Sequence, residues 1–192
     1  QMLGENLVFE DLRQKHDAVV LAYGAQSARQ LDIPGVELAG VISAMDYLVS
    51  SSRALIGETP VPSIGAADKW VVVIGGGDTA MDCVRTAVRQ GAAGVTCLYR
   101  RDRTSMPGST REVGHAEEEG VAFGWQSQPE ALLDVPVDVI ASQPDGFGQS
   151  GAVRTVRAHR TQLVPSEHNG RPMPAKVTGS DFETAADLVI NA

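Results

Sequence analysis

The chain is poor in the residues that build metal centres, nucleic-acid platforms and membrane spans. It has 2 cysteines, Cys83 and Cys97, and no Cys-x-x-Cys pair, so clustered ligands for zinc or an iron–sulfur centre are lacking. Aromatic residues make up 5% of the sequence and the formal net charge is −8, which disfavours binding to nucleic acid. No apolar run approaches the ~20 residues of a membrane span. We therefore expect a cytoplasmic protein that binds no metal, no nucleic acid and no membrane.

Apolar runs and helical patterns alternate through the first two thirds of the chain. The runs typical of buried strands are at residues 17–22, 70–74, 95–99 and 121–125, with a last one at 187–191. Helical patterns cover residues 9–15 and begin again at Ser43, Asp78 and Ser109. Ser43 and Ser109 also begin capping boxes. The strand–helix order between residues 69 and 125 predicts a right-handed, parallel, doubly wound sheet.

The pattern changes after residue 125. Three further strands are expected, at residues 137–141, 152–160 and 171–177. Glycine-rich turns separate them, and no helical pattern lies between them. This part of the chain therefore predicts an antiparallel meander, which gives an α/β fold with a Rossmann-like parallel sheet and a second, antiparallel part.

A glycine-rich motif joins the strand at 70–74 to the helix that follows it. The motif satisfies G-x-G-x-x-A in the strand-to-helix context that gives this pattern meaning. The first glycine permits the sharp turn, the third lets a pyrophosphate approach the backbone, and the alanine allows close helix–strand packing. Free N–H groups at the helix start would face the phosphates. The candidate cofactor-binding residues are Gly75, Gly76, Gly77, Asp78, Thr79 and Ala80.

Asp78 is the unusual member of this motif. A carboxylate beside a pyrophosphate is repulsive unless it points away, so Asp78 would instead cap the helix. Thr79, the next residue, would add a hydroxyl donor to the phosphates. The alternative to a nucleotide site is a glycine turn without a ligand.

The end of the next strand indicates which dinucleotide binds. NAD sites and many adenosyl-methionine sites place an acidic residue there to hold ribose hydroxyls. This chain has Arg100 and Arg101 instead, the first of them 25 positions after the first glycine of the motif. Guanidinium groups suit a ribose 2′-phosphate, so we expect NADPH, and a methyltransferase is disfavoured. A solvated basic loop in which Asp102 pairs with an arginine is the alternative, and the roles of Arg103 and Arg111 stay open.

These motifs resemble the NADPH-binding segment of the small subunit of bacterial NADPH-dependent glutamate synthase. The resemblance covers residues 17–192. Dihydropyrimidine dehydrogenase and related ferredoxin-linked reductases share a looser form of the pattern. The segments that carry the resemblance are residues 72–86, 97–101, 106–109, 111–113 and 116–120.

The resemblance implies a division of the chain, because the family inserts its NADPH domain into an FAD domain. Residues 1–61 would be a flanking segment of the FAD domain and a crossover, 62–186 the NADPH-binding domain, and 187–192 a strand returning to the FAD domain. The strands at 17–22 and 187–191 should then lie side by side. Residues 23–25 would turn near the flavin, and Ala192 would begin a stretch that approaches both cofactors. The chain would thus be a piece of a longer protein.

The resemblance also implies a function for the whole protein. NADPH would reduce FAD, and electrons would pass through iron–sulfur clusters to a large (alpha) subunit that makes glutamate from glutamine and 2-oxoglutarate. No side chain here need be catalytic, since the cofactors carry the chemistry. The FAD fingerprint and the iron–sulfur cysteines are absent, so this chain alone should bind NADPH without electron transfer. A paralogous reductase subunit and a non-catalytic nucleotide-binding domain are the alternatives.

Overall fold

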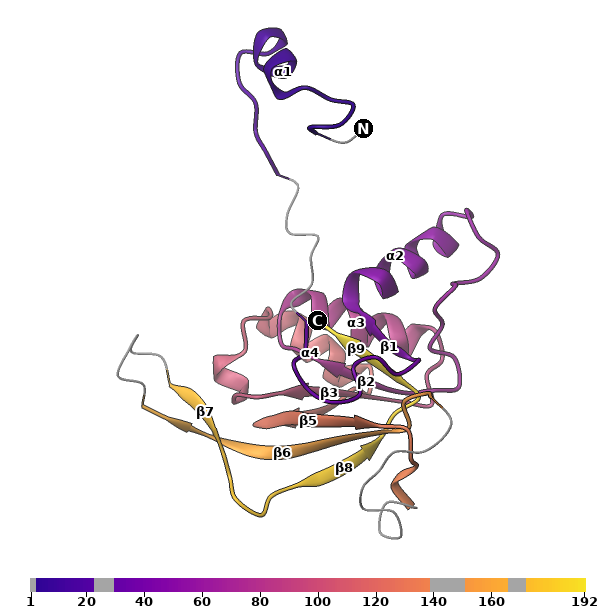
Figure 1. Cartoon of the computed structure of the whole chain (residues 1–192), viewed down its shortest axis with the longest axis vertical. Coiled ribbons are helices and arrows are strands. Elements are labelled where there is room, and N and C mark those ends of the chain that lie inside the picture. Colours follow the sequence, from indigo (N-terminus) through magenta and orange to yellow (C-terminus); the bar gives the residue numbers. More distant parts are fainter. Residues whose placement is uncertain (1–2, 23–29, 139–150, 166–171) are drawn as a thin grey trace.

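The structure, a computed structural model, describes residues 3–22, 30–138, 151–165 and 172–192. Helices cover one face of a five-stranded parallel sheet, and an antiparallel sheet covers the other face (Figure 1). The expected α/β fold with a parallel and an antiparallel part is therefore confirmed. The expectation of a doubly wound sheet is wrong, because the antiparallel sheet covers the face where a second layer of helices would lie.

The parallel sheet has the strand order β1-β9-β2-β3-β4. Its strands are β1 (Val41–Ser43), β2 (Trp70–Ile74), β3 (Gly94–Tyr99), β4 (Ala122–Trp125) and β9 (Leu188–Asn191). The helices are α1 (Phe9–Lys15), α2 (Ala44–Leu55), α3 (Asp78–Arg89) and α4 (Thr110–Glu118), with a short 3₁₀ helix, η1 (Arg103–Ser105). The expected helices thus form, and Ser43 caps α2 by accepting a hydrogen bond from the Asp46 amide.

The second sheet is antiparallel and is built around one long strand. Its strands are β5 (Ser127–Leu133), β6 (Thr155–Val164), β7 (Met173–Lys176) and β8 (Phe182–Ala185). β5 pairs with one edge of β6, while β7 and β8 pair with successive parts of the other edge. Two of these strands, β5 and β8, were not expected from the sequence. The strand expected at 137–141 does not form at residues 137–138, and its remainder lies outside the described residues.

Alternate residues of the central strands fill the two layers of the core. Val71 and Val73 of β2 pack with the helices, whereas Val72 and Ile74 pack with the antiparallel sheet. Side chains alternate across a strand, so a strand that is covered on both faces needs an unbroken apolar run. The run 70–74 therefore forms a central strand, and its carboxyl end is held at a fixed place between the two layers.

The expected pairing of residues 17–22 with residues 187–191 is wrong. Residues 17–22 form no strand, and Val20 is 86% exposed. β9 instead lies between β1 and β2 and pairs in parallel with both. An apolar run predicts that a strand forms but does not indicate which strands it pairs with. Strands from both flanking parts of the chain, β1 and β9, thus join this sheet, and α2 follows β1 directly.

A further correction concerns the start of α4. Ser109 is its N-cap residue, but the Ser109 side chain makes no capping hydrogen bond. Glu112, the other half of the expected capping box, pairs with Arg85 of α3. Arg85 also pairs with Glu119 at 2.9 Å, so ion pairs link α3 to α4. The Ser109 amide, which a capping box would bind through Glu112, donates to Asp78 instead.

Candidate functional site

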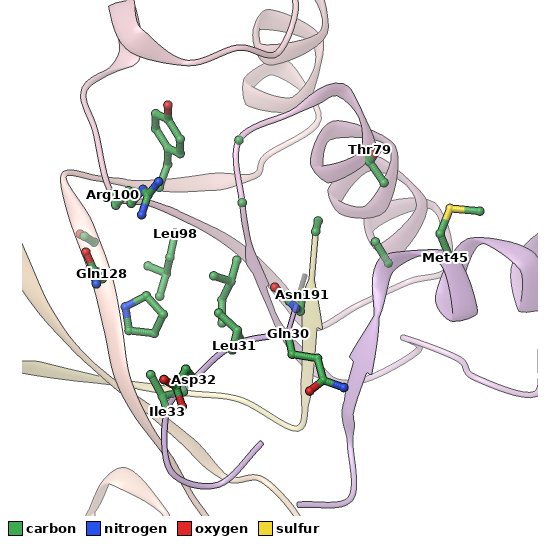
Figure 2. A pocket seen from close by; sticks show the side chains of 18 residues that line it. Gln30, Leu31, Asp32, Ile33, Met45, Thr79, Leu98, Arg100, Gln128 and Asn191 are labelled. Atoms are coloured by element: carbon green, nitrogen blue, oxygen red, sulfur yellow. The ribbon is translucent and has the colours of Figure 1, made fainter. Parts of the chain in front are cut away.

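A pocket of about 680 Å³ lies at the carboxyl ends of the parallel strands. Its volume is in the range of small-molecule sites, and open α/β sheets bind ligands at this edge. Arg100 and Gln128 lie on one side of the pocket, and Thr79 and Met45 lie on the opposite side (Figure 2). Five of the residues proposed from the sequence line it, namely Gly75, Gly76, Thr79, Arg100 and Ala192. Gly77, Asp78, Ala80 and Arg101 do not line it.

Gly75 makes the sharp turn out of β2. Its φ is 150°, in the region that favours glycine, and a Cβ here would collide with the carbonyl oxygen of Ala192. Ala192 is held at this place because its amide donates to the Ile74 carbonyl at 2.9 Å. The turn and the end of β9 therefore pack backbone against backbone, which only glycine at position 75 allows.

Gly76 and Gly77 differ in their surroundings. A Cβ on Gly76 would lie 2.5 Å from the ring of Tyr99, so this glycine serves the packing of the turn against β3. A Cβ on Gly77 would meet no atom within 4 Å. Gly77 is also the N-cap residue of α3, and Ala80 behind it is fully buried in the core. The backbone before α3 is therefore bare on its outer side, where an anion can approach the helix start.

The carboxylate of Asp78 contacts a neighbouring loop. Its Oδ1 accepts a hydrogen bond from the Ser109 amide at 2.8 Å. One residue earlier, the Gly108 amide donates to the Gly76 carbonyl at 2.9 Å. The loop before α4 is thus bound to the glycine turn at two points. Asp78 therefore anchors this loop. The expected capping role is wrong, because the N-cap residue of α3 is Gly77 and the Asp78 carboxylate binds the Ser109 amide instead.

Arg100 and Arg101 directly follow the end of β3. Neither forms an ion pair with any described residue, although the chain as a whole is acidic. The Arg100 side chain is exposed at the pocket, and the Arg101 Nε is buried without a hydrogen-bond partner in the described part of the chain. A buried donor without a partner is costly, and an anion is the kind of group that would satisfy it.

Asp102 and Arg103 are occupied elsewhere. Asp102 accepts hydrogen bonds from the Ser105 amide at 2.8 Å and the Thr104 hydroxyl at 3.0 Å. The bonds from Ser105 hold the pKa of Asp102 below its ordinary value. Arg103 binds both oxygens of Glu117 at 2.7 Å. Asp102 therefore forms the turn at η1 and does not pair with an arginine within the described ranges.

Sequence reasoning missed one wall of the pocket. Residues 30–33 and 127–129 line it, together with Met45. Residues 31–35 are pressed against β5, since a Cβ on Gly35 would collide with the Leu132 carbonyl and Gly35 has a φ of 88°. The Pro34-Gly35 pair was the available signal for this close approach. It marks a turn but does not say which strand the turn contacts.

Three other features of the described residues bear on the chemistry. Cys83 and Cys97 are free and fully buried, and burial raises the pKa of each thiol to about 12, so neither is a reactive thiolate near neutral pH. Ligand atoms of Glu130, His159 and Asp181 lie within 4.8 Å of one another, but the Lys176 ammonium already bonds to both carboxylates. None of the helices in the described ranges has the length and apolar character needed to cross a membrane.

The chain belongs to the pyridine nucleotide-disulphide oxidoreductase family, whose sequence pattern matches residues 3–155. Proteins of this family are oxidoreductases that bind FAD and NAD(P)H. The chain is similar to the glutamate synthase [NADPH] small chain of Azospirillum brasilense, with 47% identity over 99% of this chain and 37% of the relative. The putative glutamate synthase [NADPH] small chain of Cereibacter sphaeroides is 48% identical over 99% of this chain and 43% of the relative.

The chain is therefore a homologue of glutamate synthase small chains, and it spans less than half of their length. Solved structures agree on the fold. Mycobacterium tuberculosis FprA in complex with NADPH matches with a TM-score of 0.72 at 21% identity, over 100% of this chain and 52% of FprA. The thioredoxin reductase of T. acidophilum matches with a TM-score of 0.52 at 13% identity, over 86% of this chain and 40% of the reductase.

Proposed function

We propose that this chain is the NADPH-binding module of an oxidoreductase of the glutamate synthase small-chain type. The observation that carries the proposal is the arginine pair, Arg100 and Arg101, at the strand end beside the glycine turn, where neither side chain forms an ion pair within the described ranges. A ribose 2′-phosphate satisfies unpaired guanidinium groups, whereas the free hydroxyls of NADH leave them without an anion.

The residues around the glycine turn also suit the pyrophosphate of a dinucleotide. The bare backbone at Gly77 admits a pyrophosphate to the start of α3, and Thr79 lies at the pocket to donate from its hydroxyl. The loop anchored by Asp78 flanks the same turn. Bound NADPH supplies a hydride. The side chains here bind and orient the cofactor, and none of them acts as an acid or base.

For the whole protein we propose the longer electron path. The parts of residues 1–61 and 187–192 that lie outside the parallel sheet would connect this module to an FAD-binding domain, and Ala192 would begin a stretch near both cofactors. Electrons from NADPH would pass through FAD and iron–sulfur clusters to a large subunit, for glutamate synthesis from glutamine and 2-oxoglutarate. This proposal rests on the names and identities of the small-chain relatives and on the place of Ala192 at the pocket.

A paralogous reductase is the second candidate. In Escherichia coli, the putative oxidoreductase UacF is 40% identical to this chain, and the glutamate synthase [NADPH] small chain is 39% identical. Overall identity therefore does not separate the two functions. Mixing the full-length protein with a glutamate synthase large subunit distinguishes them. NADPH-dependent glutamate formation supports the first candidate, and NADPH oxidation with other acceptors but no glutamate supports the second.

The proposed module is tested directly by calorimetric titration of the purified chain with NADPH and NADH. We expect NADPH to bind at least about 10-fold more tightly than NADH, because hydrogen bonds to a charged group contribute about 1.5–3 kcal/mol. The preparation should show no flavin absorbance, because the FAD fingerprint is absent from the sequence. Equal affinities for the two nucleotides, or stoichiometric flavin that survives gel filtration, would contradict the proposal.

A separate substitution tests the anchoring role of Asp78. Asp78→Ala removes one of two hydrogen bonds that hold the loop before α4, so NADPH binding should weaken about 3- to 10-fold. Asp78→Asn keeps an acceptor oxygen, and its affinity should stay close to that of the unaltered chain. Tighter binding by Asp78→Ala would mean that the carboxylate chiefly repels the phosphates and that the loop needs no anchor.

A further inference from the structure

The backbone of the arginine pair is held by the antiparallel sheet. The Thr161 hydroxyl of β6 donates to the Arg100 carbonyl at 2.7 Å. The Gln126 amide donates to the Arg101 carbonyl at 2.9 Å, and the Thr161 amide donates to the Gln126 carbonyl at 2.8 Å. These three bonds form a closed connection between the end of β3, the link from β4 to β5, and the middle of β6.

The connection depends on an uncommon backbone conformation. Gln126 has a φ of 50°, in the left-handed region that costs energy for a residue with a side chain. It stands between β4 of the parallel sheet and β5 of the antiparallel sheet. This conformation lets its amide meet Arg101 while its carbonyl meets Thr161, so one residue connects both sheets to the arginine loop.

Thr161 supplies the only side chain in this connection. Its residue is 4% exposed, so its hydroxyl bonds to the Arg100 carbonyl away from competing water. The Arg100 side chain, in contrast, is exposed and forms no ion pair with a described residue. The direction in which Arg100 leaves the backbone is therefore set chiefly by what holds its carbonyl, and the guanidinium itself is free to meet a ligand.

We propose that Thr161 is a positioning residue that sets the preference for a phosphorylated dinucleotide by fixing the backbone of Arg100. The inference rests on the proposed function, because it requires Arg100 and Arg101 to meet the ribose 2′-phosphate. It assigns the antiparallel sheet a role in specificity, although β6 lies far from the glycine motif in the sequence. Thr161 itself does not contact the cofactor.

The test compares two buried threonines of the same strand. Thr161→Val removes the hydroxyl bonded to Arg100. Thr155→Val removes a hydroxyl that donates to the Val135 carbonyl, also at 2.7 Å, near the other end of β6. Thr155 is fully buried, so the two changes should cost similar stability. They differ in which carbonyl loses its hydrogen bond, that of Arg100 or that of Val135. Thr161→Ala serves as a second deletion variant, and Thr161→Ser restores the donor.

The dissociation constants of NADPH and NADH are measured for each variant, with Arg100→Ala in the same series. Thr161→Val and Thr161→Ala should weaken NADPH about 3- to 10-fold and leave NADH nearly unchanged, as expected for one buried hydrogen bond. Thr161→Ser keeps the donor and should retain the preference for NADPH over NADH. Thr155→Val should lower the unfolding temperature but leave this preference unchanged.

The outcomes separate this inference from the function on which it rests. If Arg100→Ala selectively weakens NADPH binding but Thr161→Val and Thr161→Ala do not, the role of Thr161 alone is overturned. No selective loss in Arg100→Ala overturns both. Equal losses for the two nucleotides in Thr161→Val, matched by Thr155→Val, also overturn the role of Thr161, because a general loss of stability would then explain the effect.

Discussion

The double substitution of Arg100 and Arg101 by alanine should weaken NADPH binding at least about 100-fold and nearly erase the preference over NADH. Hydrogen bonds to charged groups contribute about 1.5–3 kcal/mol each, and about 1.4 kcal/mol corresponds to a tenfold change. Each arginine should therefore account for about 10- to 100-fold in the affinity for NADPH. NADH lacks the 2′-phosphate, so its affinity should change little. Calorimetric titration of both nucleotides measures the two effects.

Arg103 provides the matched control for this experiment. It lies in the same loop, but both of its terminal nitrogens bind Glu117 at 2.7 Å. Arg103→Ala removes one positive charge from this loop, as each single arginine substitution does, yet it should leave the NADPH affinity nearly unchanged. Equal losses for NADPH and NADH in the double variant would show that Arg100 and Arg101 only support the loop. A large selective loss in Arg103→Ala would show that the ion pair opens to bind the phosphate.

The elements around the glycine turn could be predicted because their signals are local. An apolar run fills two core layers at β2, and the glycine motif directly after it begins α3. The turn at Gly75 and the burial of Ala80 follow from the same short segment. The arginine pair was also visible, because it stands directly after β3. A short stretch of sequence contains everything that these predictions need.

Features that depend on a distant partner could not be predicted. Nothing near residues 187–191 shows that β9 lies between β1 and β2. The sequence at Ser109 satisfies the capping-box pattern. In the structure, however, the Ser109 amide donates to Asp78, and Glu112 forms an ion pair with Arg85. A local pattern states which bonds a residue is able to make, and the packing of α4 against α3 decides which bonds form.

The site shows the same division between local and distant information. The residues expected to meet the phosphates were named from the motif, whereas the groups that hold them were not. Gly76 packs against Tyr99, and the Arg100 backbone is held by Thr161, 61 positions later. The antiparallel sheet was expected only as a separate meander. Its contact with the arginine loop becomes visible only when both sheets are placed together.

The two outer glycines of the turn should respond to substitution in opposite ways. Gly77→Ala should fold, with a stability cost below about 1 kcal/mol for a changed N-cap residue, since its Cβ meets no atom within 4 Å and its φ is −86°. Gly75→Ala should be destabilised by about 3 kcal/mol or more, because its Cβ meets the Ala192 carbonyl and its φ is unfavourable for alanine. Denaturant titration of both variants measures this difference.

Binding should separate Gly77 from the arginine pair. The Cβ of Gly77→Ala occupies the space through which a pyrophosphate reaches the start of α3, and both NADPH and NADH carry that pyrophosphate. Overpacking of this kind costs about 1–3 kcal/mol, so both nucleotides should bind about 10- to 100-fold more weakly. The ratio of the two affinities should stay the same, unlike in the arginine variants. If Gly77→Ala folds and binds both nucleotides normally, the phosphates do not approach the backbone at this glycine, and the bare surface before α3 has another use.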